Sequence, residues 1–212
     1  MVPVERDGPV LGVRPYGDRA LLVEAGDLAG VAAVREALEA APLPGQVDLV
    51  AAARTVLVVL DRPPADTDGP ALRRLTHHPG RPEEAATVVE LEVVFDGPDL
   101  TEVGELTGHS VSEVIAAVTS AELTVAFTGF APGFGYLTGL PGDLRVTRRS
   151  TPRTRVPAGA VGLAGSFAGV YPRASPGGWQ LIGRTDAVLF DADRRPPALL
   201  TPGTRVRFRE RP

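Results

Sequence analysis

A chain of 212 residues suits one large domain or two small ones, and its 43% hydrophobic residues are typical of a globular protein with a buried core. A net charge of −4 argues against a nucleic-acid or anionic-membrane surface, and the absence of cysteine and lysine excludes disulfides, thiolate catalysis, Schiff-base chemistry and the phosphate-loop lysine within this chain. The first residues lack the pattern of a signal peptide, and no apolar window is long enough to span a bilayer, so we expect a cytoplasmic protein.

Residues 1–85 are expected to form a small α+β domain. Asp27 is placed to cap the first helix, and Pro70 suits the first turn of the second. The predicted elements, in chain order, are a strand at 20–23 after the turn Tyr16-Gly17-Asp18, a helix at 28–41, strands at 47–50 and 55–60, and a helix at 71–78. This order suggests a ferredoxin-like sandwich.

Residues 86–212 are expected to form a second domain, after a polar, proline-bearing joint at 80–86. Asp99 is placed to cap a helix over 100–107, and Ser110 with Glu113 forms a capping-box pattern for a helix that ends near residue 120. Short strands are predicted at 87–95, 124–128, 159–164, 180–183, 187–190 and 204–208. Strands alternating with tight turns, together with a helix pair, are the pattern of a closed β-barrel.

The stretch from Phe127 to Arg184 holds 12 of the 24 glycines, several prolines and most of the aromatic residues. Glycine permits positive φ and close backbone approach, whereas proline fixes φ. The stretch therefore predicts rigid loops on a β scaffold, which serve either a binding site or only the tight corners of a compact barrel.

Ordinary catalytic patterns are absent from the sequence. His77, His78 and His109 have no metal-ligand or triad spacing, so we predict no metal site. Ser166 and Ser175 lie in no nucleophile-elbow pattern, which argues against a Ser-His hydrolase.

Arginines and aromatic residues are the remaining candidates for a site. The arginines can bind a carboxylate or phosphate in a bidentate fork, or form a solvated rim. The aromatic residues can wall a pocket or fill the barrel. The two sets are Arg145, Arg148, Arg149, Arg153, Arg155 and Arg184, and Phe130, Phe134, Tyr136, Tyr171 and Trp179.

The glycine-rich loop at 129–135 lacks the Gly-Lys-Ser/Thr ending of a phosphate loop, so nucleotide binding by this chain alone is not expected. Exposed backbone N–H groups in this loop could still receive an oxyanion or carboxylate.

Four motifs, in this order, resemble the family of the 5-oxoprolinase B subunit, also described as allophanate hydrolase subunit 1 and as the sporulation kinase A inhibitor family. They are Gly129-Phe130-Ala131-Pro132-Gly133-Phe134-Gly135-Tyr136-Leu137, the segment 152–159, Tyr171-Pro172 and the segment 175–185. The stretch 17–24 also resembles the opening of that family, so the resemblance covers nearly the whole chain.

The resemblance implies an N-terminal α+β domain and a cyclophilin-like C-terminal β-barrel. It implies work with the A and C subunits as partners, a complex that cleaves 5-oxo-L-proline to L-glutamate with ATP bound at the level of the complex. The small-molecule amide substrate or an anion is then expected at the motif residues, with no catalytic residue assigned. These residues are Phe130, Pro132, Gly133, Tyr136, Arg153, Arg155, Trp179 and Arg184.

The sequence departs from the family pattern at several positions. Thr119 stands where the family usually has a histidine, Leu123 where it has a tyrosine, Thr147 where it has a proline and Ala160 where it has a serine. Two other functions stay open: inhibition of a histidine kinase, and a subunit of the allophanate hydrolase or urea carboxylase type.

Overall fold

The computed structural model describes residues 10–75 and 88–211. The chain divides into two compact units, residues 1–84 and 85–212. The expected joint at 80–86, as well as His77 and His78, lie outside the described residues. Within the described ranges, no helix is both long and apolar enough to cross a membrane.

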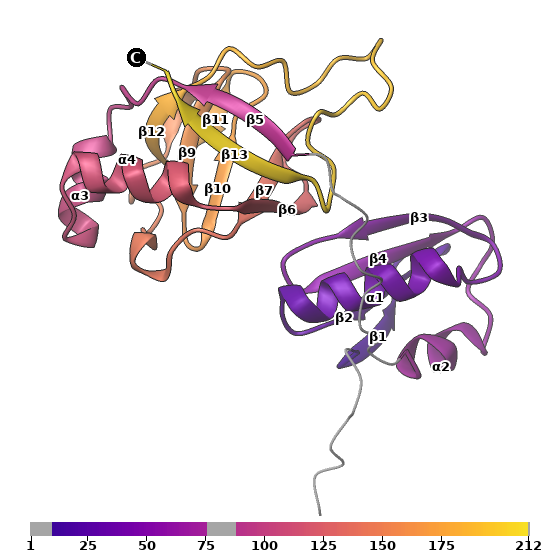
Figure 1. Cartoon of the computed structure of the whole chain (residues 1–212). Helices are drawn as coiled ribbons and strands as arrows, with labels where there is room; N and C mark the ends of the chain where they lie inside the picture. The colour runs from indigo at the N-terminus through magenta and orange to yellow at the C-terminus, as the bar shows by residue number, and fades with distance from the viewer. Residues whose placement is uncertain (1–9, 76–87, 212) are drawn as a thin grey trace, which may run out of the picture. The chain divides into compact units, whose positions relative to one another are not determined.

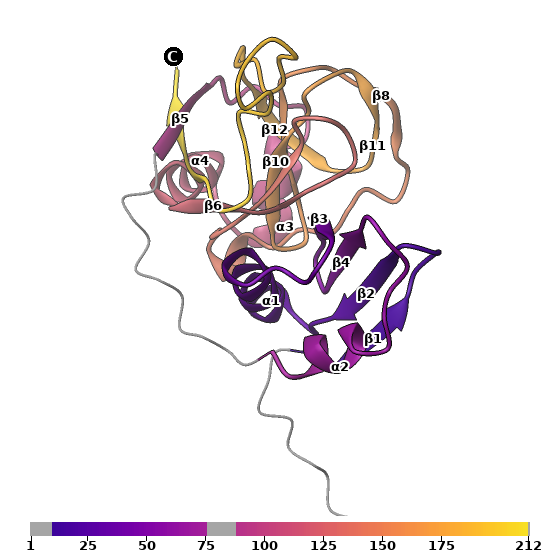
Figure 2. The same ribbon diagram turned by 90° about the vertical axis from the view of Figure 1, so that its right-hand side faces the viewer.

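The first unit is a four-stranded antiparallel sheet with two helices (Figure 1). Its elements are β1 (Gly12–Pro15), β2 (Ala20–Glu24), α1 (Leu28–Ala40), β3 (Gln46–Ala51), β4 (Thr55–Leu60) and α2 (Asp68–Arg73). The strand order is β1-β2-β4-β3, with α1 packed against β3 and β4 and α2 beside β1 (Figure 2). β1 lies at the edge of the sheet beside β2 and precedes both helices in the chain. The ferredoxin-like assignment of this unit stays a prediction.

Local sequence explains where these two helices begin. Asp27 caps α1 as predicted, because its Oδ1 accepts a hydrogen bond from the Gly30 N–H at 2.8 Å. The prediction of α2 at 71–78 was wrong at both bounds, since the helix runs from Asp68 to Arg73. The buried Asp68 carboxylate accepts from the Ala65 N–H at 2.7 Å and pairs with Arg62 at 2.7 Å, which fixes the turn before the helix.

The second unit is a nearly closed barrel with a helix pair. Its elements are β5 (Val88–Val93), α3 (Leu100–Thr107), α4 (Val111–Ser120), β6 (Leu123–Thr128), β7 (Gly135–Thr138), the 3-10 turn η1 (Gly142–Leu144), β8 (Arg153–Val156), β9 (Ala160–Ala164), β10 (Phe167–Val170), β11 (Ser175–Gly177), β12 (Gln180–Arg184) and β13 (Arg205–Glu210). Seven strands follow the order β12-β9-β10-β7-β6-β13-β5, and β8 pairs separately with β11. The chain is thus a mixed α/β protein with a barrel-like sheet, and the cyclophilin-like assignment stays a prediction.

The two edges of the seven-stranded sheet meet just beyond β5. Val94 and Arg184 exchange two backbone hydrogen bonds of 2.9 Å and so join the end of β5 to β12. Gly183 is required at this seam, because a Cβ there would lie 2.5 Å from the Val94 carbonyl oxygen. Closure of this kind protects edge strands that would otherwise expose unpaired backbone groups.

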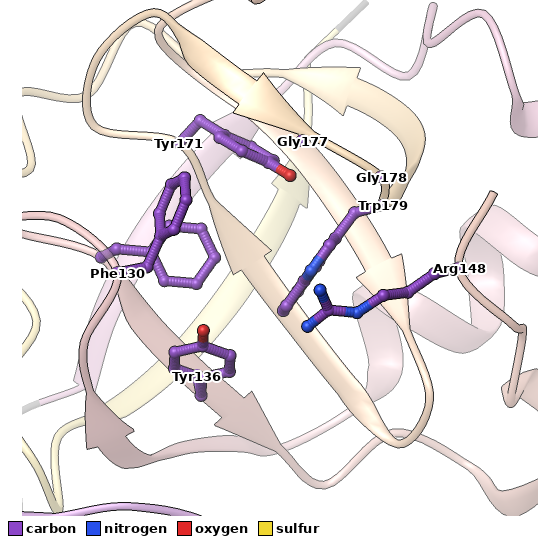
Figure 3. Close-up of a pocket in the computed structure, with 8 residues that line it drawn as sticks. Phe130, Tyr136, Arg148, Tyr171, Gly177, Gly178 and Trp179 are labelled. Carbon is purple, nitrogen blue, oxygen red and sulfur yellow. The ribbon is translucent and has the colours of Figure 1, made fainter. Parts of the chain in front are cut away.

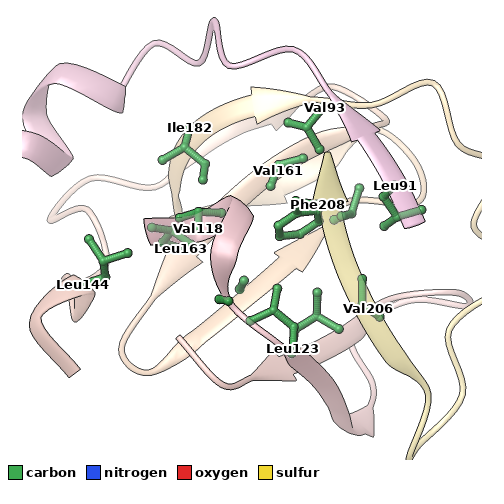
Figure 4. Packing of buried hydrophobic residues seen from close by; sticks show 14 of the residues in the cluster. Leu91, Val93, Val118, Leu123, Leu144, Val161, Leu163, Ile182, Val206 and Phe208 are labelled. Carbon is green, nitrogen blue, oxygen red and sulfur yellow. The ribbon is translucent and has the colours of Figure 1, made fainter. Parts of the chain in front are cut away.

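The barrel is filled by aliphatic side chains and one phenylalanine, Phe208, which is fully buried (Figure 4). Val118 of α4 and Leu144 of η1 belong to the same cluster as Leu123 of β6 and Ile182 of β12. The helix pair therefore buries its apolar stripe on the barrel, as expected for amphipathic helices.

Two predictions in this unit have clear outcomes. The capping box of α4 is confirmed, with the Ser110 hydroxyl and the Glu113 side chain satisfying each other's backbone N–H groups. The predicted strand at 187–190 was wrong, because only Phe190 makes an isolated bridge, to Ala198. The segment instead runs as a loop whose Leu189 is buried while Val188 is 62% exposed.

Candidate functional site

An aromatic pocket lies in the second unit, at the motif residues. It is lined by Phe130, Phe134, Tyr136, Arg148, Tyr171, Gly177, Gly178 and Trp179, and its volume is ≈ 50 Å³. Figure 3 shows the aromatic rings around the hollow, with the Arg148 guanidinium beside Trp179. The pocket combines apolar walls with one cation, which suits a small ligand that has an apolar body and a negative end.

Arg148 is the only charged residue of this pocket lining. Its Cζ lies 5.9 Å from the centroid of the Trp179 ring, within the range of a cation–π contact. Among the described residues it has no carboxylate partner, and its side chain is exposed. The guanidinium donors of Arg148 are therefore available to an anion from solution.

The aromatic walls are held by their own ring contacts. Phe134 makes edge contacts with Trp179 at 5.4 Å, with Tyr171 at 5.5 Å and with Tyr136 at 5.0 Å between ring centroids. Such edge-to-face pairs are each worth about 0.5–1.5 kcal/mol beyond their area burial. The buried Phe134 thus fixes the positions of three other rings that line the pocket.

Phe130 forms the exposed rim of the pocket. Its backbone φ is 65°, a left-handed conformation that a bulky residue rarely adopts, and its side chain is 57% exposed. Its ring contacts Phe134 at 5.3 Å and Tyr171 at 6.0 Å. A strained backbone and an exposed aromatic ring at a pocket mouth are typical of a ligand contact.

The Tyr171 hydroxyl keeps its proton at neutral pH. Burial raises the pKa of this phenol, while a hydrogen bond with the Trp179 backbone and the nearby charge of Arg148 oppose the rise. Gly177 gives the hydroxyl its space, because a Cβ at that position would collide with the Tyr171 oxygen. Position 177 therefore requires a residue without a Cβ.

A second hollow, the arginine groove, shares no lining residue with the aromatic pocket. Its volume is ≈ 320 Å³. Three arginines and one aspartate are its charged residues, and the rest of its lining is small or apolar. The groove is lined by Asp96, Gly97, Pro98, Arg153, Arg155, Pro157, Ala158, Ala160, Leu181, Gly183 and Arg184.

Asp99 pairs with Arg153 of this groove, and its observed role differs from the predicted one. It precedes α3 as expected, but its side chain makes no capping hydrogen bond. Its Oδ1 instead accepts from Arg153 at 2.6 Å and from Arg149 at 2.8 Å, and its Oδ2 accepts from the Leu181 N–H at 2.7 Å. The carboxylate is 3% exposed, and two guanidinium groups satisfy a buried charge better than a helix end does.

The sequence-predicted site residues fall into three groups in the structure. Phe130, Tyr136 and Trp179 line the aromatic pocket. Arg153, Arg155 and Arg184 line the arginine groove. Pro132 and Gly133 line neither hollow; Pro132 is exposed, while Gly133 has a φ of 85° and lies against Leu189 and Phe190.

Five of the eight pocket residues were not among the assigned site residues: Phe134, Arg148, Tyr171, Gly177 and Gly178. Arg148 was one of a cluster of arginines, and nothing in its spacing distinguished it from Arg149. Tyr171 and Gly177 belong to motifs that resemble the family, and this was the available signal.

Thr119 lies where the resemblance leads to a histidine. Its hydroxyl donates to the Ile115 carbonyl oxygen of the preceding helical turn at 2.8 Å, and the residue lines neither hollow. This side chain is engaged by its own helix and cannot replace an imidazole in proton transfer.

Comparison with known proteins agrees with this architecture. The profile of the carboxyltransferase domain, subdomain C and D, matches residues 11–200, and the chain belongs to this family. The resemblance to the B subunit of 5-oxoprolinase is confirmed by curated relatives of that name. The protein from Escherichia coli O157:H7 is 49% identical over 129 residues, which are 59% of either chain, and that from Bacillus subtilis (strain 168) is 46% identical over 124 residues, 57% of this chain and 52% of the relative.

The matched stretches thus span little more than half of these relatives' length. Among solved structures, TTHA0988 is 37% identical with a TM-score of 0.75, over 92% of this chain and 40% of that one. The urea carboxylase of Kluyveromyces lactis has a TM-score of 0.67 at 19% identity, over the whole of this chain and 24% of the other. This last likeness shows a shared fold.

Proposed function

We propose that the chain is a non-autonomous subunit of an ATP-dependent 5-oxoprolinase, which cleaves 5-oxo-L-proline to L-glutamate together with its partners, the A and C subunits. The observation that carries the proposal is the Arg148 cation at an aromatic pocket, in a chain similar to proteins named as the B subunit of 5-oxoprolinase. 5-Oxoproline is a compact lactam ring with one carboxylate, the chemistry for which such a pocket is suited.

Distinct roles follow for the side chains of the pocket. Arg148 binds the substrate carboxylate, since guanidinium and carboxylate form charge-assisted hydrogen bonds. Trp179 and Tyr136 face the ring, and the Tyr171 hydroxyl, kept protonated by its raised pKa, donates to the lactam carbonyl oxygen. None of these side chains is assigned a covalent step.

The pocket's size favours a shared site. A cavity of ≈ 50 Å³ holds only one end of a ligand, because pockets that enclose a whole ligand usually measure about 300–1,000 Å³. We therefore place the reacting lactam bond, and most of the nucleotide, against the partner subunits. The lactam amide is stable and must be activated before water can open it. This need for activation explains why the reaction is coupled to ATP.

Substitution of Arg148 in the reconstituted three-subunit complex tests the proposal. Arg148→Ala is expected to lower kcat/KM for 5-oxoproline by about 10- to 100-fold, the equivalent of about 1.5–3 kcal/mol for a charged hydrogen bond. Arg148→Lys should recover part of this loss. Arg145→Ala, also exposed but outside the pocket, is the matched control. Normal turnover by Arg148→Ala in an intact complex would overturn the assignment.

A second candidate is a carboxyltransferase-type subunit of urea metabolism. The family name and the urea carboxylase fold favour it. The engaged hydroxyl of Thr119 counts against it, because no imidazole stands at that position. Reconstitution with a biotin carboxylase partner separates the two: biotin-dependent carboxylation of urea supports this candidate, and ATP-dependent release of glutamate supports the first.

A further inference from the structure

The arginine groove carries more positive charge than its own surroundings neutralise. Its charged lining residues are Arg153, Arg155, Arg184 and Asp96, a net formal charge of +2. Asp99 lies outside the lining and pairs with Arg153, but its Oδ1 also accepts a hydrogen bond from Arg149. The groove thus keeps a cationic surplus that a bound anion would compensate.

Donors for such an anion are present on two of these arginines. Arg155 is exposed and has no ion-pair or hydrogen-bond partner among residues 10–75 and 88–211. Arg153 keeps its Nη1 buried and without a hydrogen-bond partner in the same part of the chain, although its Nη2 is held by Asp99. A buried unpaired donor is costly, so it is expected to be satisfied by a ligand or by water.

Arg184 can supply a third contact. Its Nε lies 2.9 Å from Asp96 Oδ2, and the two side chains are 55% and 47% exposed. Exposed pairs of this kind are weak, so a more highly charged partner can displace Asp96. Because β8 and β12 carry Arg153 and Arg184, the cationic groups of the groove stand on strands rather than on free loops.

The remaining walls of the groove are apolar or small. They include Pro98, Pro157, Ala158, Ala160 and Leu181. At ≈ 320 Å³ the groove reaches the size of pockets that bind small molecules. The ligand that fits these walls has a compact apolar body next to its anionic group.

We infer that the arginine groove binds a small phosphate-bearing molecule, at a site separate from the aromatic pocket. A phosphate monoester carries about −1.5 to −2 charges at neutral pH and three acceptor oxygens, which match the several available donors of the groove. A single carboxylate offers fewer acceptor oxygens to the donors of Arg153, Arg155 and Arg184. This inference does not depend on the proposed reaction, because it concerns binding to this chain alone.

Titration of the full chain with phenyl phosphate, followed by calorimetry and by ¹H–¹⁵N NMR, tests the inference. Saturable binding is expected, with amide shifts at Arg155 and Leu181. Arg155→Ala should weaken binding by about tenfold, the loss expected for a charged hydrogen bond. Arg155 is chosen because its side chain has no partner to lose among the described residues, whereas Arg153 also holds Asp99.

Matched variants and probes identify the site and the ligand class. Arg148→Ala and Arg145→Ala should bind phenyl phosphate as the unsubstituted chain does. In the Arg148→Ala chain, which lacks the cation of the aromatic pocket, benzoate, with the same apolar body and a carboxylate, should bind at least several-fold more weakly than phenyl phosphate. Four results would each overturn the inference. They are binding of phenyl phosphate that does not saturate, equal weakening of this binding by Arg145→Ala, loss of binding with Arg148→Ala instead of Arg155→Ala, and tighter binding of benzoate than of phenyl phosphate. The titration uses neither the partner proteins nor 5-oxoproline, so failure of the proposed function would leave its result unchanged.

Discussion

Asp99 joins the segment before α3 to the barrel wall through one buried carboxylate. It accepts from two guanidinium groups and from the backbone N–H of Leu181, while its own backbone N–H donates to the Leu181 carbonyl at 3.0 Å. Arg153 lines the arginine groove, and Arg149 directly follows Arg148 of the aromatic pocket. A structural ion pair therefore determines where the arginine-bearing segment runs.

Asp99→Ala is expected to lower the free energy of unfolding by about 3 kcal/mol, because it leaves Arg153 without an anionic partner, Arg149 with the exposed Glu102 alone, and the Leu181 N–H without its acceptor. Denaturant unfolding monitored by Trp179 fluorescence measures the change, since the chain has a single tryptophan. Glu102→Ala is the control: Glu102 also pairs with Arg149, at 3.2 Å, but is 50% exposed, so its loss should cost less than about 1 kcal/mol. Equal effects of the two substitutions would contradict the structural role of Asp99.

The residues of the site show which part of it the sequence could reveal. Phe130 and Trp179 were identified because they lie in motifs rich in glycine and proline. Arg148 was not separated from its neighbours, because ion pairs between residues some 50 positions apart decide which arginines are engaged. Such long-range pairing leaves no periodic trace in the sequence.

At the scale of elements, local signals predicted the helices and the longer strands. β4 was predicted with its observed bounds, since apolar residues fill the run Thr55–Leu60. The capping residues Asp27 and Ser110 placed α1 and α4. Strands β1, β7, β8, β10 and β11 were missed, because each has at most four residues and includes glycine, proline or exposed polar residues that lack a clear alternation. These strands are fixed by pairing with distant neighbours rather than by their own propensity.

The capping box of α4 gives that element a predictable dependence on pH. The hydrogen bonds from the Ser110 hydroxyl and backbone hold the pKa of Glu113 below its ordinary value of 4.5. Because the pKa is lower in the folded state, the stabilisation is fully present above pH 4.5 and is lost as the pH falls through the folded-state pKa. The advantage of the unsubstituted chain over Glu113→Gln should therefore be constant near neutral pH and shrink below pH 4.5.

Thermal unfolding of both chains across this pH range measures the effect. Carboxylates shared by the two chains, such as Asp68 and Glu90, also have lowered pKa values, but their contributions cancel in the difference. A difference that persists unchanged to pH 2 would show that the charge of Glu113 has no part in the cap.

At the scale of the whole molecule, each unit has its own hydrophobic interior. The second unit contains both the barrel cluster around Phe208 and the aromatic cluster around Phe134, and all residues of both hollows belong to it. Its final strand, β13, pairs in parallel with β5 and antiparallel with β6, so the barrel needs both ends of this unit. The ion pair Arg209–Glu90, at 2.6 Å, adds a contact across the β13–β5 pairing.

A chain of residues 85–212 is therefore expected to fold alone, with one cooperative thermal transition and a midpoint within a few degrees of the Trp179 transition in the full chain. The single tryptophan reports on this unit in both chains. A fragment of residues 85–203 is the control, because it lacks β13 and leaves β5 and β6 without their shared neighbour; it should show no cooperative transition. If the longer fragment also unfolds without cooperativity, the barrel draws its stability from the first unit, and the two hollows would then have to be studied in the full chain alone.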